Sequence, residues 1–202
     1  MTSASTIMWK RLDRAGHEVA ELAAVEGGWR LTGVVIVEDD GLPCRLEYAI
    51  ECDAEWRTRR ARVFGQLGGT PVSLDLAHGT RRGWQVNGVS IAELHHCVDV
   101  DLEFSPSTNL LPIRRLRLAV GAHGLARAAW VRFPSLVVEP LEQTYTRLAA
   151  DRYRYETTDG EFEREITVND EGLVLEYPGQ WRTEAASRGD DHLDHGDDAT
   201  AR

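Results

Sequence analysis

The sequence predicts an all-β protein built on a single large, curved and mostly antiparallel sheet that forms a barrel-like half-shell. Two observations along its 202 residues predict this fold. Glycine-containing dipeptides typical of β-hairpin turns recur along the chain. The segments between them have the length of strands and alternate apolar with polar side chains. The dipeptides are Gly27-Gly28, Asp40-Gly41, Gly68-Gly69, His78-Gly79, Asn87-Gly88, His123-Gly124, Asp159-Gly160 and Glu171-Gly172.

The alternation is clearest in the segments 46–52, 98–103, 116–120 and 166–168. Each of them places apolar side chains on one face of a strand and leaves the other face polar or charged. Such strands must cover their apolar face, so a large antiparallel sheet has to curl onto itself, close, or stack on a second sheet. We therefore expect a curved sheet.

Helix competes with strand in two segments, 17–25 and 141–150. The first has glycines on both sides and is long enough for only about two helical turns. The second contains Thr144, Tyr145 and Thr146, which suit a strand equally well. The sequence leaves both segments open.

We expect one β domain at 7–182, preceded by a flexible N-terminus at 1–6 and followed by a disordered acidic tail at 183–202. One β domain of this length can bury a sizeable core. The tail is polar and acidic and cannot offset the entropy of ordering. The letters DAEW at 53–56 and DGEF at 159–162 indicate a weak internal duplication, although similar hairpins produce such a match by chance.

The composition argues against several classes of partner. The net charge is -10, whereas nucleic acids and anionic membranes attract clustered positive charge, so we expect no nucleic-acid partner. No segment approaches the roughly 20 apolar residues that span a bilayer, and the start lacks the apolar core of a secretory signal, which predicts a cytoplasmic protein without an integral membrane segment. Cys44, Cys52 and Cys97 form no CxxC pair and are expected to be buried thiols. No cofactor is expected, because the glycines occur in hairpin pairs and not before a helix.

The segment 97–118, CVDVDLEFSPSTNLLPIRRLRL, places a row of acids on one face of a strand. Successive members lie about 6.6–7 Å apart in an extended strand. If the following residues form the second strand of a hairpin, Arg115 and Arg117 neutralise the row across the sheet. The alternative is that the row binds a ligand. The acids are Asp99, Asp101 and Glu103.

Arg114 differs from these two arginines, because in a strand it shares a face with Leu116, Leu118 and Val120. A cation on the apolar side either extends its charge to water at the strand end or holds a polar head group at the rim of an apolar cavity.

This segment resembles the family described as putative glycolipid-binding, known mostly as a domain of unknown function, through CxDVDLxxxPxTN followed by LPIRRL at 111–116. The likeness extends to CDAEWRTRR at 52–60, GWQVNG at 83–88, AAWVRFPSL at 128–136 and GLVLEYPGQW at 172–181. The resemblance implies a mainly antiparallel, curved β fold that looks like the bacterial periplasmic lipoprotein carriers, which hold acyl chains between a bent sheet and its cover. Those carriers are exported, and this sequence shows no signal, so the resemblance does not extend to a role in envelope lipid traffic.

The resemblance implies a lipid or glycolipid ligand held in an apolar cavity of the curved sheet. Burial of an acyl chain there is worth about 0.8 kcal/mol per methylene. Arg114 is the first choice for a phosphate or carboxylate, and asparagines and aspartates suit sugar hydroxyls. Trp56 and Trp84 either stack on a sugar ring or fill the core. The candidate ligand-binding residues are Asp99, Asp101, Asn109, Arg114, Arg115, Trp56, Arg57, Arg59, Trp84, Asn87 and Tyr177.

A metal site and a serine hydrolase are the weaker enzymatic alternatives. The metal site would draw on His95, His96, Cys97, Asp99 and Asp101. Strand alternation sends His96 to the opposite side from its neighbours, so we expect no metal. A serine nucleophile would need His95 or His123 as its base, but no GxSxG motif is present.

The stronger enzymatic alternative is a hydrolase for a carbohydrate-bearing substrate, in which Asp99 and Asp101 act with Asp53 or Glu55. A carboxyl group crowded by like charges has a raised pKa and serves as a general acid. We find no catalytic motif and expect a binding protein. The hydrolase and a protein interaction scaffold without a small ligand remain alternatives, and the sequence does not fix the oligomeric state.

Overall fold

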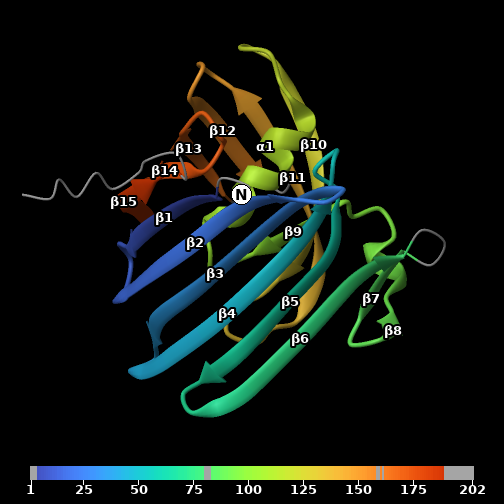
Figure 1. The fold of residues 1–202 in the computed structure, drawn as a ribbon, viewed down its shortest axis with the longest axis vertical. Coiled ribbons are helices and arrows are strands. Elements are labelled where there is room, and N and C mark those ends of the chain that lie inside the picture. The colour runs from blue at the N-terminus through green and yellow to red at the C-terminus, as the bar shows by residue number, and fades with distance from the viewer. Residues whose placement is uncertain (1–3, 80–82, 158–159, 161, 189–202) are drawn as a thin grey trace, which may run out of the picture.

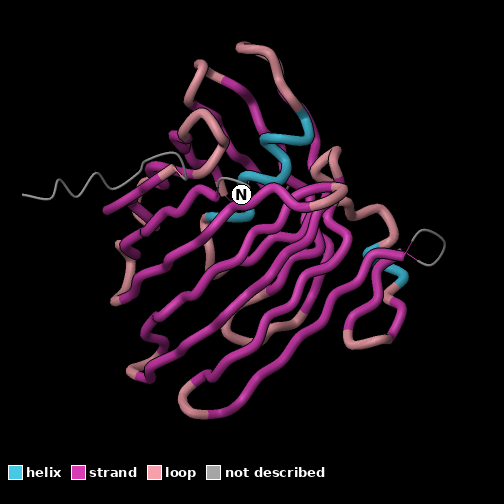
Figure 2. The backbone as a smooth tube through the Cα atoms, in the orientation of Figure 1, coloured by secondary structure: helices cyan, strands magenta, loops and turns pink. Residues whose placement is uncertain are grey.

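The computed structural model describes residues 4–79, 83–157, 160 and 162–188, and within them fifteen strands form one curved sheet (Figure 1). Strands dominate the backbone, and helix is confined to short segments (Figure 2). The strands are β1 Ala4–Arg11, β2 Gly16–Val25, β3 Gly28–Asp39, β4 Leu42–Asp53, β5 Thr58–Leu67, β6 Thr70–Gly79, β7 Gly83–Val86, β8 Val89–Ser90, β9 Asp99–Leu102, β10 His123–Val131, β11 Val138–Arg147, β12 Arg152–Thr157, β13 Glu163–Val168, β14 Val174–Tyr177 and β15 Trp181–Ser187. The helices are the 3-10 turns η1 Ala92–Leu94 and η2 Ser107–Asn109 and the α-helix α1 Leu110–Leu116.

The sheet runs in the order β8-β7-β6-β5-β4-β3-β2-β1-β15-β14-β13-β12-β11-β10-β9. Its two halves are joined where the first and last strands pair antiparallel, and the sheet ends at β8 and β9 without closing. Only β9 and β10 pair in parallel among the described strands. The predicted all-β, mostly antiparallel, curved sheet is confirmed.

Turn chemistry explains two of the hairpins. Asp40 and Gly41 have φ angles of 49° and 77°, and Asn87 and Gly88 have 49° and 82°. Two-residue hairpins of this kind need positive φ at both central positions, which Asp-Gly and Asn-Gly provide at low cost. His123-Gly124 was predicted as a turn, but it begins β10 instead.

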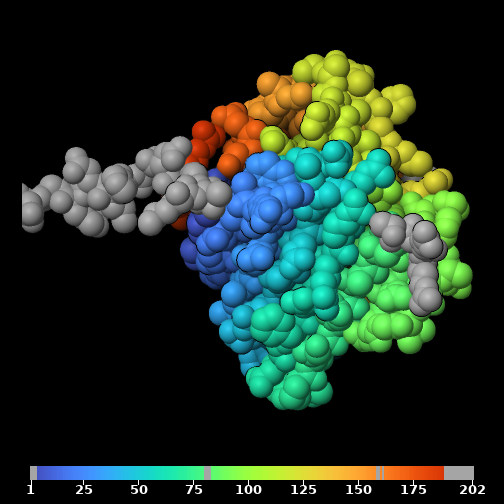
Figure 3. All heavy atoms as spheres, turned by 45° about the vertical axis from the view of Figure 1, so that its right-hand side comes forward, coloured from blue at the N-terminus to red at the C-terminus, as the bar shows by residue number. Residues whose placement is uncertain are grey.

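The interior of the half-shell is filled by large side chains. Trp9, Trp84, Trp181 and Phe104 are fully buried, together with residues from both halves of the sheet. In Figure 3 the blue-to-green surface of the first half abuts the yellow-to-red surface of the second half. The expected apolar cavity for an acyl chain is therefore occupied in the described part of the chain. Alternation shows which face of a strand is apolar, but it does not show which side chains meet across the interior.

The two segments left open between helix and strand are strands, since 17–25 lies in β2 and β11 extends to Arg147. The sheet extends beyond the predicted domain bounds of 7–182 at both ends. Residues 4–6 belong to β1, and residues 183–187 belong to β15. These end strands pair with each other, so each supplies the backbone partners that order the other. The rest of the predicted tail, from 189, and Asp159 of the proposed duplication lie outside the described residues.

Residues 114–120 were expected in a strand, but residues 114–116 end α1 and residues 117–120 form no strand. Leu110 and Ile113 are one helical turn apart and both are buried. Pro112 lies in the first turn, where its missing N–H costs no hydrogen bond, whereas in a central strand it would remove one. The predicted hairpin with β9 is therefore wrong, and the helix packs beside β9 instead.

The cysteines agree with the prediction, because Cys44, Cys52 and Cys97 are buried and free. Burial raises the pKa of the Cys52 thiol to about 12. In the described ranges no helix has the length and apolar character needed to cross a bilayer.

Candidate ligand-binding site

An aromatic cleft of about 260 Å³ opens in the second half of the sheet. It lies where β9 and η2 approach β10, β11, β12 and the turn between β14 and β15. Its wall combines ring faces and edges with carboxyl, hydroxyl and amide groups. The aromatic residues are Trp130, Tyr155, Phe162, Tyr177 and Trp181, and the polar ones are Asp101, Glu103, Ser105, Asn109, Thr157 and Gln180.

The aromatic rings support one another in edge-to-face contacts. The Tyr155 ring centre lies 5.8 Å from that of Phe162 and 6.3 Å from that of Tyr177. Such contacts add to the burial of the rings and fix their orientation. Trp130 is only partly buried, and the Arg132 guanidinium lies 4.2 Å from its ring centre. The cleft therefore has a preformed aromatic wall with one accessible indole.

Asp101 lies opposite Trp130 in the parallel pairing of β9 with β10, so both side chains are on the same face of the sheet. Gln143 Nε2 donates a hydrogen bond of 2.5 Å to Asp101 Oδ2. Burial raises the pKa of Asp101 to about 6, and the neighbouring charges of Glu103 and Asp99 act in the same direction. The cleft thus holds a carboxyl group that changes charge near pH 6.

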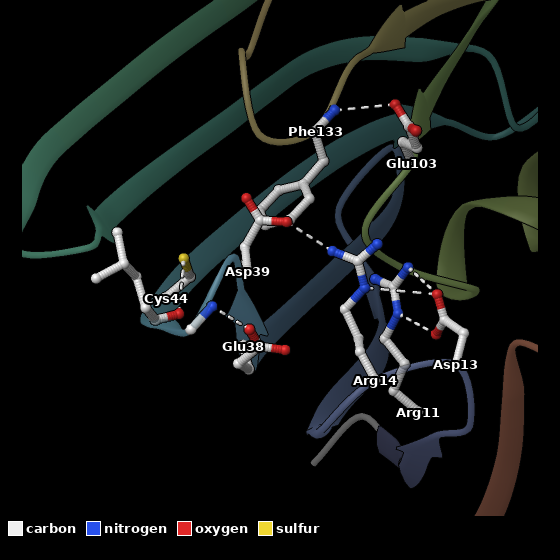
Figure 4. Close-up of polar contacts among 10 residues, drawn as sticks. Arg11, Asp13, Arg14, Glu38, Asp39, Cys44, Glu103 and Phe133 are labelled. Carbon is white, nitrogen blue, oxygen red and sulfur yellow. Dashed lines mark hydrogen bonds and ion pairs between the residues drawn. The ribbon is translucent and has the colours of Figure 1, made fainter.

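Glu103 and Asn109 are both already engaged. Glu103 Oε2 accepts a hydrogen bond of 2.9 Å from the backbone N–H of Phe133 (Figure 4). Asn109 Oδ1 accepts one of 3.0 Å from Tyr145, and its amide donates to the Pro106 carbonyl at 3.1 Å. Asn109 is nearly buried, so it acts mainly to position the cleft wall.

Ser105 connects the cleft to a buried polar ring on its inner side. The Ser105 and Tyr48 hydroxyl oxygens each lie 2.6 Å from Glu18 Oε1, within hydrogen-bond distance. Ser107 Oγ lies 2.7 Å from both hydroxyl oxygens, which closes a ring of four contacts. The three hydroxyls supply only three hydrogens, so a Glu18 protonated on Oε1 completes the ring by donating to one of its two hydroxyl neighbours and accepting from the other.

Burial raises the pKa of Glu18 to about 8, although the hydrogen bonds from Ser105 and Tyr48 and the charge of Arg11 oppose the shift. Glu18 Oε2 is buried and has no hydrogen-bond partner in the described structure. An ionised carboxylate with an unpaired buried oxygen costs considerably more than the neutral acid with the same unpaired oxygen. Arg11 itself is held by both Asp13 oxygens, at 2.7 and 3.2 Å (Figure 4).

Tyr48 reaches this ring by lying across Gly33, its partner on β3. We expect Gly33→Ala to cost about 1–3 kcal/mol of unfolding free energy, because overpacking a filled interior costs that much. A Cβ at Gly33 would stand 2.4 Å from Tyr48 ring atoms and force the ring away from Glu18. Urea denaturation measures the loss. Gly79→Ala is the control, since its nearest neighbour would be 3.8 Å away, and equal losses in the two variants would contradict the crowding at Gly33.

Asp99 and Arg115 form a buried ion pair outside the cleft. Arg115 donates Nε to Oδ1 at 2.9 Å and Nη2 to Oδ2 at 2.6 Å, and Asp99 is 1% exposed. Burial raises the pKa of Asp99, and the hydrogen bonds and charge of Arg115 oppose that rise. Arg115 therefore neutralises Asp99, as predicted. The ion pair joins the helix α1 to the strand β9, whereas the prediction placed both residues on strands.

The remaining predicted residues lie outside the aromatic cleft, at several separate places. Trp84 is fully buried and donates its indole N–H to the Cys97 carbonyl at 2.9 Å. Asn87 forms the β7–β8 turn and accepts a hydrogen bond from the backbone N–H of Asp75. Arg57 and Arg59 line a separate hollow with Asp53 and His78.

Trp56 and Arg114 lie together, with the guanidinium 5.1 Å from the ring centre, at a second hollow. Of the predicted candidates, the structure brings only Asp101, Asn109 and Tyr177 into the aromatic cleft. Sequence reasoning missed Trp130 and Glu18, although a glutamate among alternating apolar residues of β2 was a visible signal. In the described residues no three His, Cys, Asp or Glu side chains gather as a metal site.

The comparisons with known proteins agree with this fold. The model of the family described as putative glycolipid-binding matches residues 6–183. A DUF1089 family protein from Pseudomonas aeruginosa has 33% sequence identity and a TM-score of 0.74, over 83% of this chain and 91% of that protein. A β-barrel-like protein of the domain of unknown function DUF1849 from Brucella abortus has 8% identity and a TM-score of 0.51, over 93% of this chain and 97% of that one, and shows likeness of fold alone. No curated protein matches the sequence.

Proposed function

The chain belongs to the family described as putative glycolipid-binding, and from that membership we propose that it binds the carbohydrate head of a glycolipid in the aromatic cleft. The observation that carries the proposal is the combination, in one preformed cleft, of an accessible indole with carboxyl and hydroxyl groups. Aromatic faces suit the apolar face of a sugar ring, and oxygen acceptors suit its hydroxyls.

The size of the cleft supports a head group and not a whole lipid. Pockets for drug-sized ligands measure about 300–1,000 Å³, and this cleft measures about 260 Å³. Large side chains fill the sheet interior, so the proposal places the acyl chains outside the cleft. This replaces the acyl cavity expected from the resemblance with a site for the polar end of the ligand.

Within the cleft, the proposal assigns one role to each accessible group. Trp130 stacks on the sugar ring, and Asp101 on the same face of the sheet accepts hydrogen bonds from sugar hydroxyls. Ser105 is buried and bonded to Glu18, so it holds the polar wall of the cleft and does not contact the sugar. Because Asp101 has a pKa of about 6, binding should weaken as the pH falls below that value and its charge is lost.

Trp130→Ala tests the proposal. We expect roughly a fivefold loss of binding to vesicles that contain a monoglycosyl diacylglycerol, because stacking on an aromatic ring is worth about 1 kcal/mol. Co-sedimentation with vesicles that contain or lack the glycosyl head measures the effect. Phe64→Ala, which removes an exposed ring on β5, is the matched control. Equal binding to both vesicle types by the natural chain would reject the head-group site.

A hydrolase acting on the same head group is a second candidate, because Asp101, with its raised pKa, and Glu103 line one cleft. It differs from the pair expected from the sequence, since Asp99 is held by Arg115. Release of sugar from chromogenic glycosides, abolished in Asp101→Asn, would support it. If the chain neither binds the glycosyl head nor releases sugar, the interaction scaffold becomes the leading role.

A further inference from the structure

The second hollow, of about 490 Å³, lies beside α1 and shares no lining residue with the aromatic cleft. It is bordered by the end of α1, the β11–β12 connection and the β13–β14 turn. Three arginines line it, against a single carboxylate among the described lining residues. The polar and aromatic lining residues used below are Trp56, Arg114, Arg117, Arg147, Tyr153 and Asp170.

Arg147 is fixed by the backbone and serves as a structural cation. Its guanidinium donates to the carbonyls of Leu118 at 2.9 Å, Ala149 at 3.2 Å and Ala150 at 2.6 Å. It also lies 5.6 Å from the Tyr153 ring centre. This side chain therefore fixes the wall of the hollow. Its partners are neutral carbonyl groups, so its positive charge is not neutralised.

Arg114 and Arg117 are different, because neither guanidinium forms a hydrogen bond or ion pair with another residue in the described ranges. Arg114 lies over Trp56, which is itself stacked on Trp29 with ring centres 4.5 Å apart. A guanidinium stacked on an aromatic face is oriented while its N–H donors stay free. Most other arginines of this acidic chain have carboxylate partners.

The backbone at Arg117 adds a second observation. Arg117 ends α1 with a φ of 48°, a conformation usually taken by glycine or asparagine at this position. Residues held in such conformations cluster at ligand sites. The helix dipole favours a positive charge near the last turn of any helix. That effect alone does not explain why an arginine occupies position 117, where the backbone is left-handed.

The carboxylate of the hollow does not neutralise these arginines. Asp170 is hydrogen-bonded to Arg188 at 3.1 Å. The hollow thus concentrates positive charge in a chain whose net charge is -10.

From this geometry we propose that the second hollow binds a phosphate group through Arg114 and Arg117. Guanidinium groups match phosphate oxygens in planar, paired hydrogen bonds. The proposal does not depend on the aromatic cleft.

Titration of the protein with inorganic phosphate by calorimetry tests the site. A parallel titration with sodium chloride at equal ionic strength measures the general effect of salt on the charged surface, which is then subtracted. We expect saturable binding by the natural chain and at least a tenfold lower affinity in the Arg114→Gln/Arg117→Gln variant. Arg30→Gln, at an exposed arginine on β3, is the matched control and should bind as the natural chain does. Both variants change exposed or partly exposed side chains, and their unfolding curves check that the fold is kept.

A second arm distinguishes a soluble phosphate from a lipid head group. Co-sedimentation uses phosphatidylcholine vesicles with and without phosphatidic acid. Binding that requires phosphatidic acid and is lost in the double variant supports a lipid phosphate, and binding of inorganic phosphate alone supports a soluble phosphate ester. Binding of neither probe, or an equal loss in Arg30→Gln, overturns the proposal. Neither probe carries a sugar, so failure here leaves the glycosyl-head proposal standing.

Discussion

In the Glu18→Gln variant, the free energy of unfolding should fall less than in the natural chain as the pH rises from about 4.5 to 8, and the fall that remains below about pH 6 belongs to Asp101. The natural chain should lose stability across that range, because the folded pKa of Glu18 is about 8 and its ordinary value is 4.5. Between the two values the unfolded chain releases a proton that the folded chain keeps, so stability decreases with a slope of up to about 1.4 kcal/mol per pH unit. The full contribution is present below the unfolded pKa and is lost as the pH passes the folded pKa.

Urea denaturation at several pH values measures this effect, and near pH 8 the variant should be more stable than the natural chain by about 1–4 kcal/mol. Glutamine keeps the shape of the side chain and donates a hydrogen without titrating. Glu21→Gln is the matched control, because Glu21 lies on the same strand with its side chain exposed on the opposite face. If both variants keep the slope of the natural chain, Glu18 is not the buried acid that the ring of hydroxyls indicates.

Arg115→Met should have the largest destabilising effect, about 3–5 kcal/mol, because it leaves the carboxylate of Asp99 buried without a partner. Asp99 is 1% exposed and receives both of its charge-assisted bonds from this arginine. The double variant Asp99→Leu/Arg115→Met should recover most of the loss, since replacing a buried ion pair by apolar side chains is often close to neutral.

Denaturant unfolding of the single and double variants measures this coupling. Arg127→Met is the matched control, because Arg127 forms an exposed pair with Glu142 at 2.6 Å and should contribute less than about 1 kcal/mol. A cost for Arg115→Met no larger than for Arg127→Met would show that the buried pair does not join α1 to β9. The outcome also bears on the hydrolase alternative, because Asp99 cannot serve as a free carboxylate while it is paired.

The candidate site was only partly accessible from the sequence. Asp101 and Tyr177 were named because they stand in segments with an unusual or family-like pattern, and both line the cleft. Trp130 was missed, since a single tryptophan in an apolar strand gives no sign of being accessible. It faces Asp101 only because β9 pairs in parallel with β10, a pairing across some 30 positions that no local pattern encodes.

The sequence by itself determined the all-β class and most of the strands, because a period of two and the turn requirements of Asp40-Gly41 and Asn87-Gly88 are local properties. It also determined the buried, unpaired cysteines. Only the tertiary structure decided that residues 110–116 form a helix, that Arg115 pairs with Asp99 from that helix, and that large side chains fill the half-shell. These outcomes depend on which distant side chains pack together in the interior and on how far their charges are removed from water. Alternation along one strand does not show which residues of other elements that strand contacts across the core.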